Sequence, residues 1–164
     1  MMSSETSWTD KAKKLVAYHS EAQDFIRRAG DELPVSPDDA LTLGRLWEEA
    51  DGLDELVCTL LDQLNNDLLK GEAEFDTTRG ASVRRSRLDQ QETLFYDCTW
   101  SLTWGGCSVV VNLSVEGKTS LYEAQVAAGS ANEVHPVSHP ISESALKAAL
   151  VSAYVAEATR SPAQ

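Results

Sequence analysis

The chain has 164 residues, of which 42% are apolar and 24% charged, a composition that indicates one folded domain and excludes intrinsic disorder. Its formal net charge is −12, from 26 acidic and 14 basic residues. This charge argues against general nucleic-acid binding and against docking on anionic lipid, because both need a basic surface, and it is compatible with a basic partner.

Nothing in the sequence directs the chain to a membrane or to the secretory route. No apolar run approaches the ~18 residues that cross a bilayer. The first residues, Met-Met-Ser-Ser-Glu-Thr-Ser, lack the basic start and apolar stretch of a signal peptide. The three cysteines match no zinc or redox spacing and favour a reducing compartment. We therefore expect a cytoplasmic protein.

Two helices are predicted in the N-terminal part of the chain. The first covers residues 7–30, where apolar residues are spaced by three and four and Gly30 provides the C-terminal cap. The second covers residues 36–70. It begins at Ser36-Pro37-Asp38-Asp39, where a serine caps, proline takes the first helical position and two acids meet the helix dipole.

The second helix carries a heptad seam, formed by Leu43, Leu46, Ala50, Leu53, Val57, Leu60 and Leu64. The short connection between the helices predicts an antiparallel hairpin, in which the first helix covers this seam. Further apolar residues, Trp47, Leu56, Leu61 and Leu68, make the stripe wider than one helix can cover. We expect the remainder to form a homodimer, with coverage by a sheet as the alternative.

A β-meander is predicted over residues 93–128. The even positions from Leu94 to Trp104 and the odd positions from Cys107 to Val115 are apolar, with Gly105-Gly106 as a two-residue turn between them. The turn and the apolar face together predict pairing of residue 104 with 107, 102 with 109, 100 with 111 and 98 with 113. A turn near Gly117 leads to a third strand over residues 119–128.

The remaining segments complete a single α+β domain over residues 1–164. Residues 72–78 and 83–88 read as short strands with a turn at Gly80, and their pairing stays open. Residues 129–140 are a predicted loop, and Ser142 caps a last helix over residues 141–159. The predicted fold is an N-terminal antiparallel helical hairpin with heptad-like spacing, packed on an antiparallel meander of three to five strands (72–128) and closed by the C-terminal helix.

No pattern in the sequence predicts a catalytic, cofactor or metal site. Cys98 and Cys107 with His135 and His139 resemble a zinc set in composition, but the predicted register separates the two thiols by roughly 20 Å. The sequence contains neither a nucleophile elbow nor a phosphate-binding loop. Prolines keep the segment from His135 to His139 out of a helix, so only a loop can bring the two histidines together.

Charge is strongly segregated along the chain. Residues 31–67 contain eleven acids and one base, whereas four arginines fall within residues 79–87. An acidic helix face and a basic segment are each suited to docking a partner of opposite charge. The alternative is that the two regions face each other in a surface ion network. The candidate partner-binding residues are Asp38, Asp39, Glu48, Glu49, Asp51, Asp54, Glu55, Arg79, Arg84, Arg85 and Arg87.

No motif is specific enough to indicate a family, so the sequence leaves the identity of any partner open. The favoured hypothesis is a non-catalytic acidic protein-interaction module, such as an adaptor, a chaperone-like protein or an inhibitor, that binds a partner protein with a basic surface. One alternative is a nucleic-acid mimic that inhibits a DNA-handling protein. Another is a small enzyme, or a ligand-binding or metal-binding protein, that uses the loop from His135 to His139.

Overall fold

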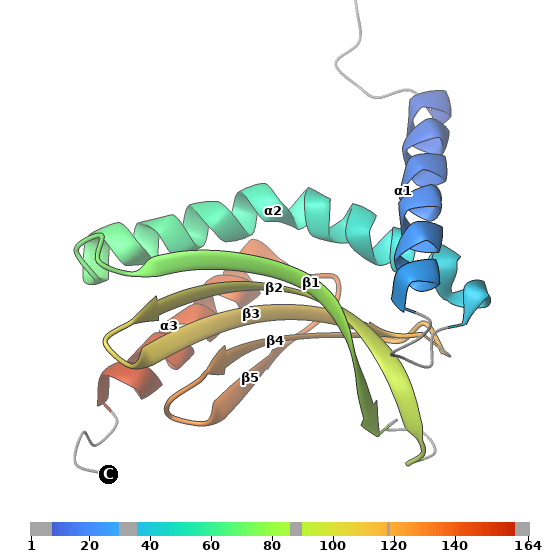
Figure 1. Cartoon of the computed structure of the whole chain (residues 1–164). Helices are drawn as coiled ribbons and strands as arrows, with labels where there is room; N and C mark the ends of the chain where they lie inside the picture. Colours follow the sequence, from blue (N-terminus) through green and yellow to red (C-terminus); the bar gives the residue numbers. More distant parts are fainter. Residues whose placement is uncertain (1–7, 30–35, 86–89, 118, 160–164) are drawn as a thin grey trace, which may run out of the picture.

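The computed structural model describes residues 8–29, 36–85, 90–117 and 119–159 as an α+β domain. Two antiparallel N-terminal helices pack together, a five-stranded antiparallel meander follows, and a C-terminal helix closes the fold. In Figure 1, α2 (Ala40–Leu68) lies above the strands and α3 (Glu143–Thr159) lies behind them.

The N-terminal helices begin and end close to the predicted positions. Helix α1 spans Trp8–Ala29, and a single 3-10 turn, η1 (Pro37–Asp39), leads into α2. The hydroxyl of Ser36 accepts a hydrogen bond from the backbone N–H of Asp38 at 3.2 Å, so Ser36 caps this end as predicted. Helix α2 is continuous through Gly52 and stops before Gly71, whose φ is 74°.

The contact between α1 and α2 is confined to the first half of α2. Phe25 of α1 meets Trp47 of α2 edge to face, with ring centroids 5.8 Å apart. At Gly44 an added Cβ would lie 3.2 Å from the backbone nitrogen of His19, which shows how closely the helices approach. The N-terminal part of α1 rises away from the sheet (Figure 1), where Trp8 is 82% exposed. The prediction that α1 covers the whole seam of α2 is therefore wrong. The second half of the seam is covered by the sheet.

The five strands follow one another as an antiparallel meander, β1 (Glu74–Arg85), β2 (Glu92–Trp104), β3 (Cys107–Glu116), β4 (Tyr122–Ala128) and β5 (Glu133–Val137). The predicted register between β2 and β3 is confirmed, with Trp104 opposite Cys107 and Cys98 opposite Leu113. Turn and apolar face agree there, so no other register buries the same residues.

Two details of the sheet differ from the prediction. The prediction of a turn at Gly80 is wrong, because β1 is one strand of 12 residues in which Gly80 pairs with Asp97. The expected loop over residues 129–140 contains β5, although Pro136 lies in that strand. Strand β5 is at the edge of the sheet, where a residue that lacks an N–H need not break a ladder of hydrogen bonds.

The core lies between the sheet and the helices that cover its apolar face. Helix α2 packs on β2 and β3, and α3 packs on β3, β4 and β5. Trp100 and Tyr96, on the predicted buried face of β2, are at most 2% exposed. Ser142 caps α3 by accepting a hydrogen bond from the backbone N–H of Ala145 at 3.2 Å, as predicted. Along the described ranges, none of the helices is apolar over a stretch long enough to cross a bilayer.

A buried carboxylate, Glu157 of α3, fastens this helix to the sheet. It is 2% exposed and accepts hydrogen bonds from the backbone N–H of Ser108 at 2.8 Å and of Ala131 at 2.6 Å. Burial by itself raises the pKa of Glu157, but these backbone donors, together with Ser130, lower it below its usual value. Glu157 therefore stabilises the fold as an anion.

Replacing Glu157 with glutamine should lower the free energy of unfolding by ~1–3 kcal/mol at pH 7, because the NH2 group of the amide would face a backbone N–H and could not accept its hydrogen bond. Since the pKa of Glu157 is depressed in the folded state, its contribution is complete above the unfolded pKa of ~4.3 and is lost as the pH falls through the folded pKa. Urea unfolding at several pH values should show the two proteins converging in acid; a constant difference would contradict this role.

Gly44 and Gly52 lie in the same helix and form a matched pair for testing the α1–α2 contact. An added methyl group at Gly52 meets nothing within 4 Å, so Gly52→Ala should stabilise the protein by ~0.5–1 kcal/mol. Gly44→Ala should be less stable than Gly52→Ala by at least ~1 kcal/mol, because its methyl group presses on the backbone of α1. Equal gains in thermal unfolding experiments would show that the contact is loose.

Candidate functional site

The acidic residues of α2 that were predicted to bind a partner fall into two groups, and the first group makes internal contacts. Asp54 accepts a hydrogen bond from the indole Nε1 of Trp100 at 2.9 Å, and Trp100 is 2% exposed. Asp39 accepts one from the hydroxyl of Tyr96 at 2.9 Å. Burial, with the bond to Asp39, raises the pKa of Tyr96. These two carboxylates satisfy buried donors of β2, which is a structural role.

Two further acids of α2 connect this helix to other elements. Glu49 lies 2.6 Å from the Nε2 of His139, whose ring stacks on Tyr122 with centroids 4.4 Å apart. Asp51 accepts hydrogen bonds from Tyr18 of α1 and from Arg79 of β1. Burial, followed by the interaction with Asp51, raises the pKa of Tyr18 to about 12. Both acids thus bring together segments that are distant in sequence.

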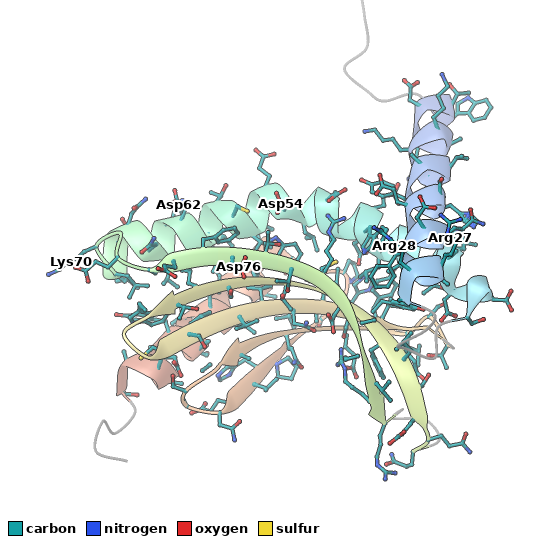
Figure 2. All side chains as sticks on the ribbon, viewed as in Figure 1. Arg27, Arg28, Asp54, Asp62, Lys70 and Asp76 are labelled. Atoms are coloured by element: carbon teal, nitrogen blue, oxygen red, sulfur yellow. The ribbon has the colours of Figure 1, made fainter. Side chains whose placement is uncertain are left out.

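The second group of acids points outward. Asp38 and Glu55 are exposed, and Glu48 is half-buried. Asp62 and Asp67, which were not among the predicted site residues, are also exposed on the second half of α2. Figure 2 labels Asp62 on the outer side of this helix. Residues 54–68 contain four acids and no base, so this part of α2 keeps a negative surface after the internal contacts are made.

The three described arginines of this segment, Arg79, Arg84 and Arg85, do not form one patch. Arg79 pairs with Asp51, so the predicted contact between the acidic and basic regions exists at this point. Arg84 lies on the other face of β1, where it pairs with Asp97 at 3.1 Å and covers the ring of Phe95. Arg85 donates to the backbone oxygen of Gln90, and Arg87 lies outside the described residues. A single basic docking surface is therefore not assembled from the described arginines.

The histidines and cysteines lie in separate surroundings. His139 is held by Glu49, whereas the Nε2 of His135 lies 3.5 Å from Glu133. Among the residues with described positions, no three metal-binding side chains gather around one point. Burial raises the pKa of Cys98 to about 12 and also raises that of Cys58, where the bond to Asp54 adds to the effect. These two thiols are therefore protonated, and poorly nucleophilic, at neutral pH.

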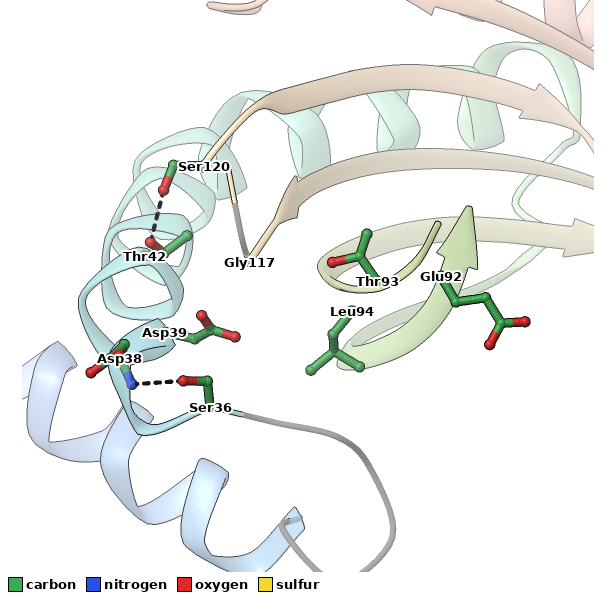
Figure 3. Close-up of a pocket in the computed structure, with 9 residues that line it drawn as sticks. All are labelled: Ser36, Asp38, Asp39, Thr42, Glu92, Thr93, Leu94, Gly117 and Ser120. Carbon is green, nitrogen blue, oxygen red and sulfur yellow. Dashed lines mark hydrogen bonds between the residues drawn. The ribbon is translucent and has the colours of Figure 1, made fainter. Parts of the chain in front are cut away.

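A polar cleft of about 530 Å³ opens beside the start of α2 (Figure 3). Asp38 and Asp39 line it from η1, and Glu92 and Thr93 line it from β2. Thr42 and Ser120 close one side through a hydrogen bond of 3.0 Å between their hydroxyl groups. The cleft gathers carboxylates at the positive end of a helix, an arrangement that stabilises the helix itself.

An apolar groove lies between the second half of α2 and α3, and we call it the α2–α3 groove. Its volume is about 530 Å³, and it is lined by Leu60, Gln63, Leu64, Asp67, Leu68, Lys147, Leu150, Val151, Tyr154 and Val155. Leu60, Leu64 and Leu150 are at most 9% exposed and form its floor. Leu68, Val151 and Val155 form its walls and are 48–62% exposed. The groove thus presents large apolar side chains of α2 and α3 to solvent.

The rows that form the α2–α3 groove have a regular spacing. Leu60, Leu64 and Leu68 follow at intervals of four along α2, as do Val151 and Val155 along α3. Side chains four apart form the ridges by which helices interlock, so a third helix can lie between these two. The excess width of the apolar stripe on α2, including Leu68, was the sequence signal for this surface. Its position beside α3 was not predictable, because it depends on where both helices rest on the sheet.

Comparisons of the chain with protein-family models, with curated proteins and with solved structures found no match. The function is therefore inferred from the chain's own residues, and the inference starts from the α2–α3 groove, whose walls are exposed apolar side chains.

Asp54 and Glu55 are adjacent acids that should differ sharply in their effect on stability. Asp54→Ala removes the acceptor of the buried Trp100 N–H and should cost ~1–3 kcal/mol. Glu55→Ala removes an exposed carboxylate and should change the free energy of unfolding by less than ~0.5 kcal/mol. Guanidinium unfolding of the two variants checks this pair. Equal effects would mean that Asp54 is merely a surface charge.

Proposed function

We propose that this protein is a non-catalytic interaction module, which binds a basic amphipathic helix of a partner protein in the α2–α3 groove. The observation that carries the proposal is the groove itself, in which Leu68, Val151 and Val155 remain about half exposed or more. Contiguous exposed apolar surface on a folded domain marks interaction sites, and an amphipathic helix laid in a groove is a recurring mode of recognition.

The charges in the lining of the groove favour a basic partner. Asp67 of α2 lines the groove and is exposed. The one lysine in the lining, Lys147, lies 2.8 Å from Glu143, its partner in an ion pair on α3. A partner helix with lysine or arginine beside its apolar face therefore meets a complementary charge, which increases the rate of association and selects against acidic helices.

This proposal fits the placement of the α2 acids better than nucleic-acid mimicry does. A mimic presents its carboxylates outward, in place of phosphates. Asp39, Glu49, Asp51 and Asp54 instead accept hydrogen bonds from side chains of the same chain. Of the acids that remain outward, Asp67 lines the apolar groove, as expected for a protein ligand that combines apolar and basic side chains.

Two synthetic helical peptides provide the test, one of leucine and lysine and one in which glutamate replaces every lysine. The basic peptide should bind in fluorescence anisotropy, and the acidic peptide should not. Val151→Asp, at a wall position that is 62% exposed, should weaken binding of the basic peptide at least roughly tenfold by placing a charge in the groove.

Val134→Asp is the matched control, because Val134 is 53% exposed but lies on β5, away from the groove lining. It should leave the affinity for the basic peptide unchanged. Equal binding of both peptides, or equal losses in the two variants, would contradict the proposed site.

A further inference from the structure

A second cavity lies between α1 and the first half of α2, and we call it the α1–α2 cleft. Its volume is about 550 Å³. Trp8, Lys11, Lys14 and Tyr18 line it from α1, and Glu48, Asp51 and Gly52 line it from α2. The helices approach closely at Gly44, and the N-terminal part of α1 rises away from α2 (Figure 1). The cleft shares no lining residue with the α2–α3 groove.

The two walls of the α1–α2 cleft carry opposite charges that do not pair with each other. Lys11 and Lys14 are on the α1 wall, and Glu48 is on the α2 wall. Within the described part of the chain, no ion pair joins either lysine or Glu48 to another side chain. Asp51, in contrast, already accepts hydrogen bonds from Tyr18 and Arg79. A group placed between the walls can therefore meet charges of both signs.

The rest of the lining is suited to a small organic molecule. The side chain of Trp8 is 82% exposed, so its indole ring is available for stacking. Gly52 leaves the α2 wall open, since an added Cβ there would meet nothing within 4 Å. The cleft volume of about 550 Å³ falls within the ~300–1,000 Å³ of typical ligand pockets, which combine aromatic side chains with a few polar groups.

We propose that the α1–α2 cleft binds a small zwitterionic ligand with an aromatic ring, of the chemical class of the aromatic amino acids. Lys11 and Lys14 receive its carboxylate, Glu48 receives its ammonium group, and its ring stacks on Trp8. A ligand of one charge only pairs with one wall and meets a like charge on the other. This site is separate from the peptide groove and does not depend on the proposed function.

The test follows the indole N–H signal of Trp8 in NMR titrations of the complete chain. L-Phenylalanine is the probe, because 3-phenylpropanoate lacks its ammonium group and 2-phenylethylamine lacks its carboxylate. Phenylalanine should bind at least roughly tenfold more tightly than either analogue. An analogue that binds as tightly as phenylalanine, or no shift of the Trp8 signal with phenylalanine up to roughly 10 mM, would overturn the proposal.

Charge variants with matched controls test the two walls separately. Lys14→Gln and Glu48→Gln should each weaken phenylalanine binding at least roughly fivefold, because each removes a charge that faces the ligand. Lys13→Gln on α1 and Glu55→Gln on α2 remove exposed charges of the same signs outside the lining and should leave the affinity unchanged. Equal losses in the variants and their controls would show that the ligand responds only to the overall charge, which contradicts the site.

Gly52→Leu tests the site without changing any charge. Leucine favours a helix more than glycine does, and the added Cβ has open space, so the variant should fold at least as stably as the wild type. Its side chain occupies part of the cleft and should weaken phenylalanine binding at least roughly tenfold. A folded Gly52→Leu protein that binds phenylalanine as the wild type does would place the ligand elsewhere and overturn the proposal.

Discussion

The structure depends on the burial of one face of the sheet. Strands β2, β3 and β4 place buried apolar side chains at alternate positions, so this face needs a layer of helices to keep it from water. Helices α2 and α3 provide that layer. Much of the apolar seam of α2 therefore packs on the sheet, and α1 contacts only the first half of α2. The bare N-terminal half of α1 and the open α2–α3 groove are both consequences of this division.

The charge of α2 is best understood as two populations of carboxylates. One population satisfies donors that the packing of α2 buries, as Asp54 does for the indole of Trp100. Leaving such a donor without an acceptor is costly, so these acids are fixed by the fold. The other population, including Asp62, is exposed to solvent on α2 (Figure 2). An acidic composition alone cannot separate the two, although their effects on stability and on binding are different.

The sequence predicts what is set by local pattern and by short connections. The register of β2 and β3 follows from Gly105-Gly106 and from strict alternation, and the caps at Ser36 and Ser142 follow from hydrogen-bonding chemistry. The turn predicted at Gly80 is wrong because glycine is more common in turns than inside strands, whereas Gly80 pairs within β1. The sequence does not predict β5 because it contains Pro136, and proline is tolerated in a strand only at the edge of a sheet. The groove depends on the placement of two helices distant in sequence, which no local pattern determines.

The central claim is that the α2–α3 groove is the binding surface of this protein. Methyl-resolved NMR of the leucine and valine side chains, during addition of the leucine–lysine peptide, tests it most directly. The account predicts that the methyl signals of Leu64, Leu68, Val151 and Val155 shift, while those of Leu121, just before β4, and Val134 of β5, which do not line the groove, stay unchanged. Shifts confined to β4 and β5, or the absence of any shift in α2 and α3, would contradict it.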